Sequence, residues 1–199
     1  MIINDRLFHI HIPRTAGRFI RQLFRVNNYD IKHSDFNELY KEIEVPHLHY
    51  PLYNEYLKVD NLPHFTVVRN PFDRFKSQIK ALPEHLEETF FSIKNQDDFN
   101  KFLNEIVPEE NPLSNWFTPQ DKFISDKTYI WKFENGFGDN FIKWLSDNFD
   151  IEIKIMVSKE DILKAEFDYE YIDMTIVDGY KKYIDEYYQN EYESLGYEI

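Results

Sequence analysis

The chain has 199 residues, enough for one hydrophobic core and too few for two ordinary enzyme domains, so a single domain over residues 1–199 is expected. It contains no cysteine, which excludes disulfides, thiolate nucleophiles and cysteine-based metal centres. A formal net charge of −13 argues against nucleic acid or an anionic membrane as the partner, and no apolar run is long enough for a signal peptide or a membrane span, so we expect a soluble, cytoplasmic protein.

Strands and helices alternate along the chain. Short apolar runs read as buried strands, and segments in which apolar residues recur every three to four positions read as amphipathic helices. In chain order, the expected elements are a strand at residues 7–12, a turn at 13–17, a helix at 18–26, a strand at 65–68, a helix from 71 with Asn70 as its N-cap, a strand at 129–133, a helix at 139–148, a strand at 151–157 and a helix at 174–192. This alternation predicts an α/β fold with a mainly parallel central sheet.

The charges are unevenly distributed. Residues 1–80 hold 12 Lys or Arg against 9 Asp or Glu, whereas residues 81–199 hold 11 against 27. Six of the seven arginines fall within residues 14–25 and 69–74, the seventh is Arg6, and none follows Arg74. Because the planar guanidinium suits bidentate contact with phosphate or sulfate, the clustering predicts an oxyanion site built from both segments. The alternative is that these arginines are solvated surface charges.

The first arginine segment leaves a predicted strand and opens a helix. Residues 11–18 read HIPRTAGR, and their one glycine and two small residues let backbone amides close around an anion while Arg14 supplies full charge. In the second segment Arg69 ends a strand and Ser77 lies two turns into the next helix, a pair suited to a second phosphate. The Walker A spacing and the GxGxxG fingerprint are both absent, which disfavours ATP, GTP and NAD as ligands.

Two segments resemble motifs of one enzyme family. Residues 10–17, IHIPRTAG, resemble the HIPKTAGT loop of the carbohydrate sulfotransferases, which binds the 5′-phosphosulfate of 3′-phosphoadenosine 5′-phosphosulfate (PAPS). Residues 68–77, VRNPFDRFKS, resemble the family's RNPYDRxxS segment, whose first Arg and Ser bind the 3′-phosphate. Weaker similarities follow in the same order at residues 116–120, 132–134 and 188–197. The resemblance spans nearly the whole chain, and its two main motifs lie about 55 residues apart on strand-to-helix turns.

The resemblance implies a three-layer α/β sandwich with a P-loop NTPase-like sulfotransferase fold. It implies an enzyme that moves a sulfuryl group from PAPS to an acceptor hydroxyl and releases 3′-phosphoadenosine 5′-phosphate (PAP). Arg14 is the expected catalytic cation, and no metal is expected because arginines and backbone amides can neutralise the leaving group. The residues implied to bind the donor are Arg14, Thr15, Ala16, Gly17 and Arg18 for the phosphosulfate, and Arg69 and Ser77 for the 3′-phosphate.

The loop departs from the family pattern at two positions. Arg14 stands where the family has lysine, and Arg18 stands where it has a second threonine. A lysine ammonium can follow the bridging oxygen of a leaving group, whereas arginine offers a fixed fork, so the exchange is not chemically neutral. A rival interpretation is therefore a protein of the same fold that binds PAP or another phosphorylated ligand without turnover. A nucleotide-kinase-like phosphotransferase is a third interpretation, disfavoured by the missing Walker motif and the lack of an evident Mg²⁺ site.

The expected general base lies in residues 45–51, VPHLHYP, because a neutral imidazole accepts a hydroxyl proton near pH 7. The H-x-H spacing resembles a segment of the uronyl 2-O-sulfotransferases whose second histidine is the proposed base, here His49. A structural role and a zinc site shared with His47 are the alternatives. Other candidate bases are the nearby Glu38, Glu42 and Glu44.

Further side chains near the motifs have two interpretations. His9 and His11 alternate on the strand that enters the loop, so at least one is expected to face the site, and both are expected to be hydrogen-bonded core histidines that orient the loop. Core packing is favoured over stacking on adenine or sugar for Trp116, Trp131, Phe133 and Trp144.

The acceptor is expected to be a carbohydrate or a small-molecule hydroxyl. The acidic balance after residue 80 favours a neutral or mildly acidic acceptor over a heparin-like chain, which it would repel. The short, cysteine-free form favours a bacterial or viral protein.

Overall fold

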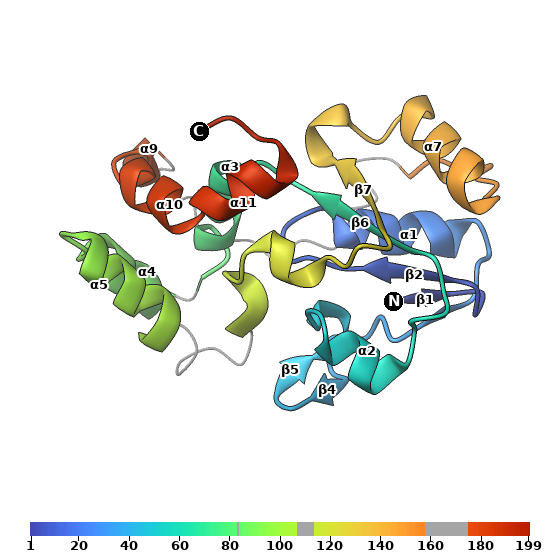
Figure 1. The fold of residues 1–199 in the computed structure, drawn as a ribbon, viewed down its shortest axis with the longest axis horizontal. Coiled ribbons are helices and arrows are strands. Elements are labelled where there is room, and N and C mark those ends of the chain that lie inside the picture. The colour runs from blue at the N-terminus through green and yellow to red at the C-terminus, as the bar shows by residue number, and fades with distance from the viewer. Residues whose placement is uncertain (83, 107–113, 158–174) are drawn as a thin grey trace.

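The computed structural model describes residues 1–82, 84–106, 114–157 and 175–199. Its centre is a five-stranded sheet with the strand order β3-β1-β2-β6-β7 (Figure 1). The central strand β2 (Leu7–Ile10) and β6 (His64–Val68) are parallel, as are β6 and β7 (Thr128–Lys132). The molecule is therefore an α/β protein whose sheet is partly parallel.

One side of the sheet is antiparallel, which differs from the mainly parallel sheet expected from the sequence. β1 (Ile2–Ile3) pairs antiparallel with both β2 and β3 (Ile31–Lys32). The chain reverses after β1 through Asn4 and Asp5, whose φ values are 48° and 54°, so the sheet is mixed. Strands of two residues are too short to show an alternating pattern, which is why they were not predicted.

The two predicted strand–turn–helix units are present and adjacent. β2 leads into α1 (Gly17–Val26), and β6 leads into α3 (Pro71–Ile79). The strands are in register with Ile10 opposite Thr66, and the Thr66 hydroxyl donates a hydrogen bond of 2.8 Å to the Ile10 carbonyl. Because parallel strands end at the same edge, the turns that follow them lie side by side.

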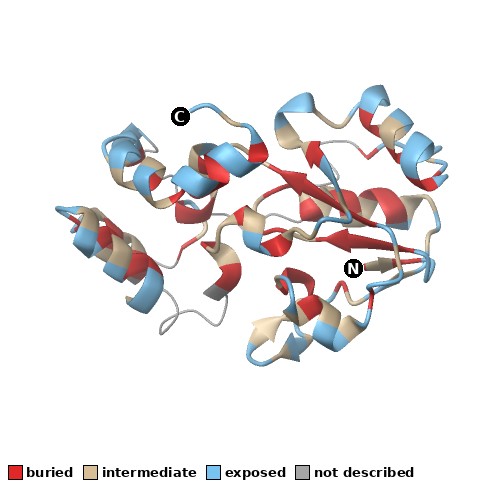
Figure 2. Ribbon diagram, in the orientation of Figure 1, coloured by how far each residue is buried: buried red, intermediate tan, exposed pale blue. Residues whose placement is uncertain are grey.

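Helices cover both faces of the sheet (Figure 2). On one face α1 and α7 (Asp139–Phe149) pack on Phe65 and Val67 of β6. On the other face Val68 packs with α2 (Leu52–Leu57), with a 3₁₀ turn η1 (Val45–His47) and with a 3₁₀ turn η4 (Gln120–Phe123). Alternate side chains of β6 thus enter opposite cores, as the period of two residues in a strand requires.

A third core lies beside the sheet, among helices, and consists mainly of aromatic side chains. Phe75 of α3 is fully buried against Phe90, Phe99 and Tyr188, with ring centroids 5.7–6.2 Å apart. The other elements of the described chain are β4 (Leu39–Tyr40), β5 (Ile43–Glu44), α4 (Glu84–Phe91), α5 (Gln96–Lys101), a π-helical turn η2 (Phe102–Ile106), 3₁₀ turns η3 (Ser114–Trp116) and η5 (Phe133–Asn135), α9 (Thr175–Asp178), α10 (Lys181–Tyr187) and α11 (Gln189–Leu195).

The strand predicted at residues 151–157 is wrong. The segment has no regular secondary structure, and its backbone bonds to the side chains of Asn27 and Tyr29 at and after the end of α1 instead of to a neighbouring strand. The Asn27 side chain donates to the Ile155 carbonyl at 2.8 Å and accepts from the Lys154 and Ile155 amides at 2.8 and 2.9 Å. Ile151 and Val157 are buried, so the apolar pattern reported burial and not strand pairing.

The continuous helix predicted at residues 174–192 is also wrong, and Met174 itself lies outside the described residues. From residue 175 onward the chain forms α9, α10 and α11, with bends at Gly179 and Tyr188. The Tyr188 hydroxyl donates a buried hydrogen bond of 2.7 Å to the Phe117 carbonyl. This tertiary contact and the glycine interrupt a segment whose periodicity alone indicates one helix.

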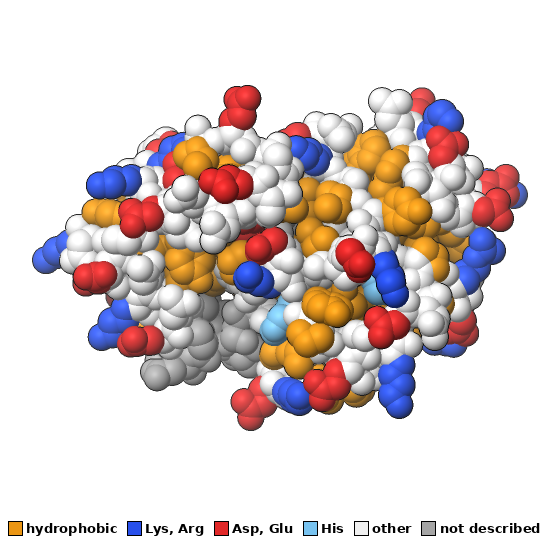
Figure 3. All heavy atoms as spheres, viewed as in Figure 1, with side chains coloured by type: hydrophobic (Ala, Val, Ile, Leu, Met, Phe, Trp, Pro, Cys, Tyr) orange, Lys and Arg blue, Asp and Glu red, His pale blue; other side chains and the backbone are white. Residues whose placement is uncertain are grey.

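The surface carries mixed charges. On the face seen in Figure 3, acidic and basic side chains are interspersed, with hydrophobic side chains between them. Within the described ranges, no helix combines the length and hydrophobicity needed to cross a membrane.

Candidate anion-binding site

The turns after β2 and β6 contact each other directly. The Arg14 Nε atom, in the first turn, donates a hydrogen bond of 3.0 Å to the Ser77 hydroxyl of α3. The two residues are 63 positions apart in the sequence. The structure therefore brings one residue of each predicted phosphate motif into the same site.

The first turn has a backbone conformation suited to an anion. Arg14 and Ala16 adopt left-handed φ values of 67° and 72°, and alternation of left- and right-handed residues directs successive N–H groups to one side. The Thr15 side chain is buried, and its hydroxyl donates to the Ile12 carbonyl at 2.8 Å, which closes the turn. Among the described residues no side chain caps α1. Its first N–H groups and its positive dipole end therefore remain available to a ligand.

Gly17 is required by packing against the His11 imidazole. A Cβ atom at position 17 would lie 1.8 Å from His11 Nε2, far inside van der Waals contact. The absence of a side chain thus lets the start of α1 approach the ring of the residue that precedes the turn. His11 is only partly buried and lines the underside of the turn.

The second turn is fixed by the predicted cap. The Asn70 side chain accepts hydrogen bonds from the Phe72 and Asp73 amides at 3.0 and 3.2 Å, which confirms Asn70 as the N-cap and Pro71 as the first residue of α3. The Arg69 guanidinium lies over the Phe133 ring, 4.6 Å from its centroid. Burial lowers the pKa of Arg69, but an arginine pKa starts so high that the group stays charged at neutral pH.

Positive charge is concentrated at these turns. Arg18 is partly exposed at the start of α1, and within the described part of the chain no carboxylate forms an ion pair with it. With Arg14 and Arg69 it gives three cations near the starts of two helices. The predicted donor residues Arg14, Thr15, Ala16, Gly17, Arg18, Arg69 and Ser77 therefore lie on the two turns or in the helices that follow them, and their role in binding stays a prediction.

The first histidine of the H-x-H segment reaches the underside of the first turn. The His47 and His11 rings are 4.6 Å apart in an edge-to-face arrangement. His47 Nδ1 lies 2.7 Å from a carboxylate oxygen of Glu44, one turn earlier. Burial lowers the pKa of His47, and the Glu44 carboxylate opposes this shift. The contact is close, but neither His47 Nδ1 nor this Glu44 oxygen has a hydrogen-bond partner of good geometry among the described residues. A neutral imidazole beside a carboxylate is an arrangement found in general bases.

His49 has different surroundings. Its ring packs edge-on against Phe123 with centroids 6.1 Å apart. Burial lowers the pKa of His49, and interaction with the Asn115 side chain opposes the shift. Asn115 also donates to the His47 carbonyl at 3.0 Å, so it holds the backbone between the two histidines.

His9 departs from the expectation that it is a hydrogen-bonded core histidine. It is buried, with its ring 4.7 Å from Phe65, and in the described part of the chain neither ring nitrogen has a hydrogen-bond partner. Burial lowers its pKa well below the usual value, and the same holds for His11. Both rings are therefore neutral at physiological pH.

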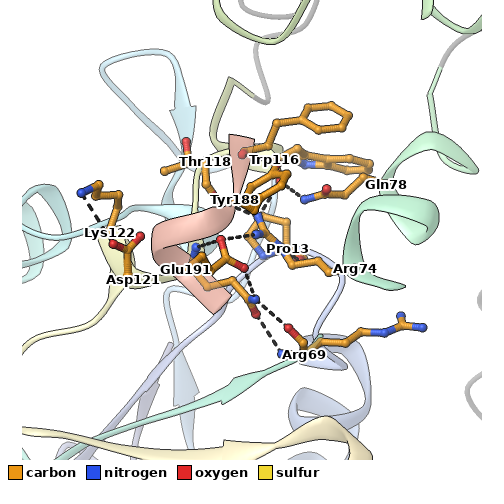
Figure 4. A network of polar contacts seen from close by, with 12 residues as sticks. Pro13, Arg69, Arg74, Gln78, Trp116, Thr118, Asp121, Lys122, Tyr188 and Glu191 are labelled. Atoms are coloured by element: carbon orange, nitrogen blue, oxygen red, sulfur yellow. Dashed lines mark hydrogen bonds and ion pairs between the residues drawn. The ribbon is translucent and has the colours of Figure 1, made fainter. Parts of the chain in front are cut away.

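A buried polar network behind the two turns was not predicted from the sequence (Figure 4). Arg74 and Glu191 have side chains only 1% and 0% exposed, and Arg74 Nη1 lies 3.6 Å from the Glu191 carboxylate. Glu191 accepts a hydrogen bond from the Gln120 amide at 2.7 Å and another from the Gln120 side chain. Arg74 lies within the second motif, and Glu191 occupies the Asp/Glu position of the weaker family-like segment at residues 188–197, but the resemblance did not identify the two as partners.

The segments with weaker family resemblance also converge on the second turn. The Gln120 side chain bonds to both the amide and the carbonyl of Arg69, at 2.9 and 2.7 Å. Glu134 accepts from the Asn70 amide at 2.7 Å and from the Tyr197 hydroxyl at 2.8 Å. Residues 116–120, 132–134 and 188–197 thus meet around residues 69–70.

The aromatic candidates are mostly core residues. Trp131 is buried and packs with Trp144 in the core under α7, as expected. Phe133 is partly buried beneath Arg69, and the Trp116 ring lies 6.0 Å from the Arg14 guanidinium carbon. Phe133 and Trp116 therefore border the cationic turns.

A hollow of about 600 Å³ lies at the opposite end of the sheet. It is lined by Asp60, Asn61, Leu62, Pro63, Asp126, Lys127, Thr128 and Tyr129. These residues precede β6 or lie at and before the start of β7, and two of them are carboxylates, the wrong charge for an anionic ligand. The carboxyl end of the sheet, with its arginines, is the better candidate for the site.

Comparisons of the chain with protein-family models, with curated proteins and with solved structures gave no significant match.

Proposed function

We propose that this protein is a PAPS-dependent sulfotransferase with a P-loop-like, three-layer sulfotransferase fold. The observation that carries the proposal is the hydrogen bond between Arg14 and Ser77, because it joins the two motif segments at the carboxyl ends of neighbouring parallel strands. One ligand with two anionic groups, such as PAPS, fits two adjacent cationic turns. The cytoplasmic location and the carbohydrate or small-molecule acceptor remain parts of this proposal.

The first turn is suited to the phosphosulfate. Its N–H groups and Arg14 would stabilise the charge that develops on the 5′-phosphate as it leaves. In the reaction the acceptor oxygen forms a bond to sulfur while the bond between sulfur and the bridging oxygen breaks, and PAP departs with that electron pair. The acceptor proton passes to a base. Arg69, whose guanidinium lies over Phe133, would bind the 3′-phosphate, which is present in donor and product alike.

Two imidazoles compete for the role of base. His49 is favoured by the family resemblance, and His47 by its contact with Glu44 and with His11 under the turn. The substitution His49→Ala or His47→Ala at the true base should lower turnover by about 10²–10⁴ while PAP affinity stays nearly unchanged, because a base acts on the acceptor. A variant that retains full turnover identifies the histidine that is not the base.

The binding-only rival is supported by one specific contact. Arg14 Nε is already engaged by Ser77, which fixes the guanidinium where the family has a mobile lysine. A protein with this arrangement can hold PAP without transferring sulfate. Release of PAP from PAPS in the presence of an acceptor hydroxyl separates the enzyme from this rival.

Thermal unfolding with nucleotides tests the proposal. At a PAP concentration 100 times its dissociation constant, binding should add about 2.7 kcal/mol to the free energy of unfolding, and ATP or GTP should add less. Arg69→Ala should weaken this effect. Arg6→Ala is the matched control. Arg6 is an exposed arginine that lies away from the turns and is paired with Asp150 at a distance of 3.6 Å. An unchanged melting temperature at saturating PAP, with the protein folded, contradicts both the enzyme and its binding-only rival.

A further inference from the structure

A continuous set of buried contacts connects the two cationic turns. Pro13, which directly precedes Arg14, accepts a hydrogen bond of 3.3 Å from Arg74 Nε. Arg74 is paired with Glu191, and Glu191 is bonded to Gln120, as described above. The Gln120 side chain in turn accepts a hydrogen bond from the Arg69 amide and donates one to the Arg69 carbonyl. The contacts thus run from the first turn to the second without passing through solvent.

The Arg74 guanidinium is held by several groups. Nε donates to the Pro13 carbonyl, Nη2 donates to the Trp116 and Thr118 carbonyls at 2.8 and 2.7 Å, and Nη1 forms the ion pair with Glu191. Figure 4 shows these groups gathered around Arg74 and Glu191, with the Arg69 side chain extending away from them. The Arg69 guanidinium is therefore free of the network, while its backbone is part of it.

The charge of Glu191 is costly to bury and has a specific compensation. Burial raises the pKa of Glu191, and the Arg74 cation and the two Gln120 donors oppose this shift. Removing one member of a buried ion pair leaves the other charge uncompensated, so the neighbouring groups rearrange. Here the neighbouring groups are the backbone of Gln120 and, through it, that of Arg69.

We propose that Glu191 is a positioning residue that holds the two cationic turns at a fixed separation, so that one ligand engages both. The inference deepens the proposed function and rests on it for the identity of the ligand. Simultaneous capture of two groups by a rigid site raises affinity by the effective concentration of the second group. Glu191 contributes to this gain without contacting the ligand.

Binding of PAP, adenosine 5′-monophosphate and adenosine 3′-monophosphate, measured by calorimetry, tests the proposal. The wild-type protein should prefer PAP over each monophosphate by about 10²-fold or more. Glu191→Gln should lose most of that preference, while its affinity for each monophosphate changes by less than about threefold, because each turn alone still offers its own groups. Retention of the wild-type preference by Glu191→Gln overturns the proposal.

Tyr188→Phe is the matched control. It removes a buried hydrogen bond from the Tyr188 hydroxyl to the Phe117 carbonyl, at the start of α11, and leaves the side chains of Arg74 and Glu191 unchanged. It should lose stability but keep the preference for PAP. A loss of preference in Tyr188→Phe equal to that in Glu191→Gln would mean that general loosening is responsible, and would overturn the proposal.

A readout that needs no ligand separates this inference from the proposed function. Exchange of the Arg69 amide hydrogen, which is bonded to Gln120, should become faster in Glu191→Gln and remain slow in Tyr188→Phe. If the wild type binds no nucleotide, the proposed function fails, and the exchange rate still decides whether Glu191 positions the turn. An unchanged Arg69 rate overturns the positioning role. Should Glu191→Gln fail to fold, Gln120→Asn shortens the same connection and leaves the Arg74–Glu191 pair in place, and both readouts apply to it with the same expected results.

Discussion

Gly17 stands where the first turn passes over the His11 imidazole. The ring is confined by its neighbours, because the His47 ring lies 4.6 Å away and the Phe36 ring 5.8 Å away. A side chain at position 17 therefore cannot be accommodated by a small rotation of His11. The identity of this one residue determines how closely α1 approaches the strand before it.

Gly17→Ala should destabilise the protein by about 1–3 kcal/mol, because the added methyl overlaps the ring and displaces the turn. Gly17→Ala should cost less stability when it is introduced into His11→Ala than when it is introduced into the wild type, because the obstructing ring is then absent. Urea denaturation of the four proteins in the cycle gives the coupling energy. Strictly additive effects would mean that the ring is not the obstacle.

At the scale of elements, the end of α1 is tied to the segment that follows α7. The residue that ends it, Asn27, donates to the Leu23 carbonyl at 2.8 Å and also clamps residues 154–155. One amide side chain thus bonds to a carbonyl near the end of the helix. It also supplies hydrogen bonds to residues 154–155 that a neighbouring strand would otherwise provide.

Asn27→Ala should release that segment. The Lys154 and Ile155 amides lose their acceptor, so their hydrogen exchange should become faster by about tenfold or more, and the stability of the protein should fall by about 1–2 kcal/mol. Lys143→Ala, at an exposed i,i+4 ion pair of α7, is a suitable control and should leave both amides protected. Unchanged exchange at both amides would show that other contacts hold the segment.

The contrast between α3 and residues 151–157 shows how far sequence patterns lead. Asn70 and Pro71 have local, short-range consequences, and the helix begins where they predict. Residues 151–157 carry an apolar pattern that fits a strand, but pairing depends on which partner lies alongside, and that partner is a side chain at position 27. A site built from both arginine segments could be predicted because each segment follows a predicted parallel strand, but the direct Arg14–Ser77 contact was not predicted. Arg74 and Glu191 each lie in a segment that resembles the family, but neither segment indicates that the two side chains are partners.

At the scale of the whole molecule, the histidines under the turn make stability depend on pH. Burial lowers the pKa values of His9, His11 and His47. In the unfolded chain they protonate below about pH 6.5, whereas in the folded protein they stay neutral to lower pH. The unfolded state therefore binds more protons, and stability is lost as the pH falls from about 6.5 toward the lowered pKa values.

His9→Phe isolates one of these contributions, because it keeps a ring beside Phe65 and removes two unpaired nitrogens. The loss of stability between pH 6.5 and 5.5 should be smaller in this variant than in the wild type, by on the order of 1 kcal/mol per pH unit. Denaturation curves at several pH values provide the comparison. Titration of the other groups affects both proteins alike and therefore cancels in the difference between them. Parallel curves would show that His9 protonates equally in the folded and unfolded states.

The position of Glu191 in the sequence affects the order in which the protein is assembled during synthesis. Glu191 belongs to α11, the last helix of the sequence, and its partner Gln120 precedes it by 71 positions. Until α11 has been synthesised, the Arg74 cation lacks the Glu191 carboxylate, and burying it costs considerable free energy. The two turns after β2 and β6 therefore acquire their final spacing only after α11 has been synthesised, although both strands leave the ribosome much earlier.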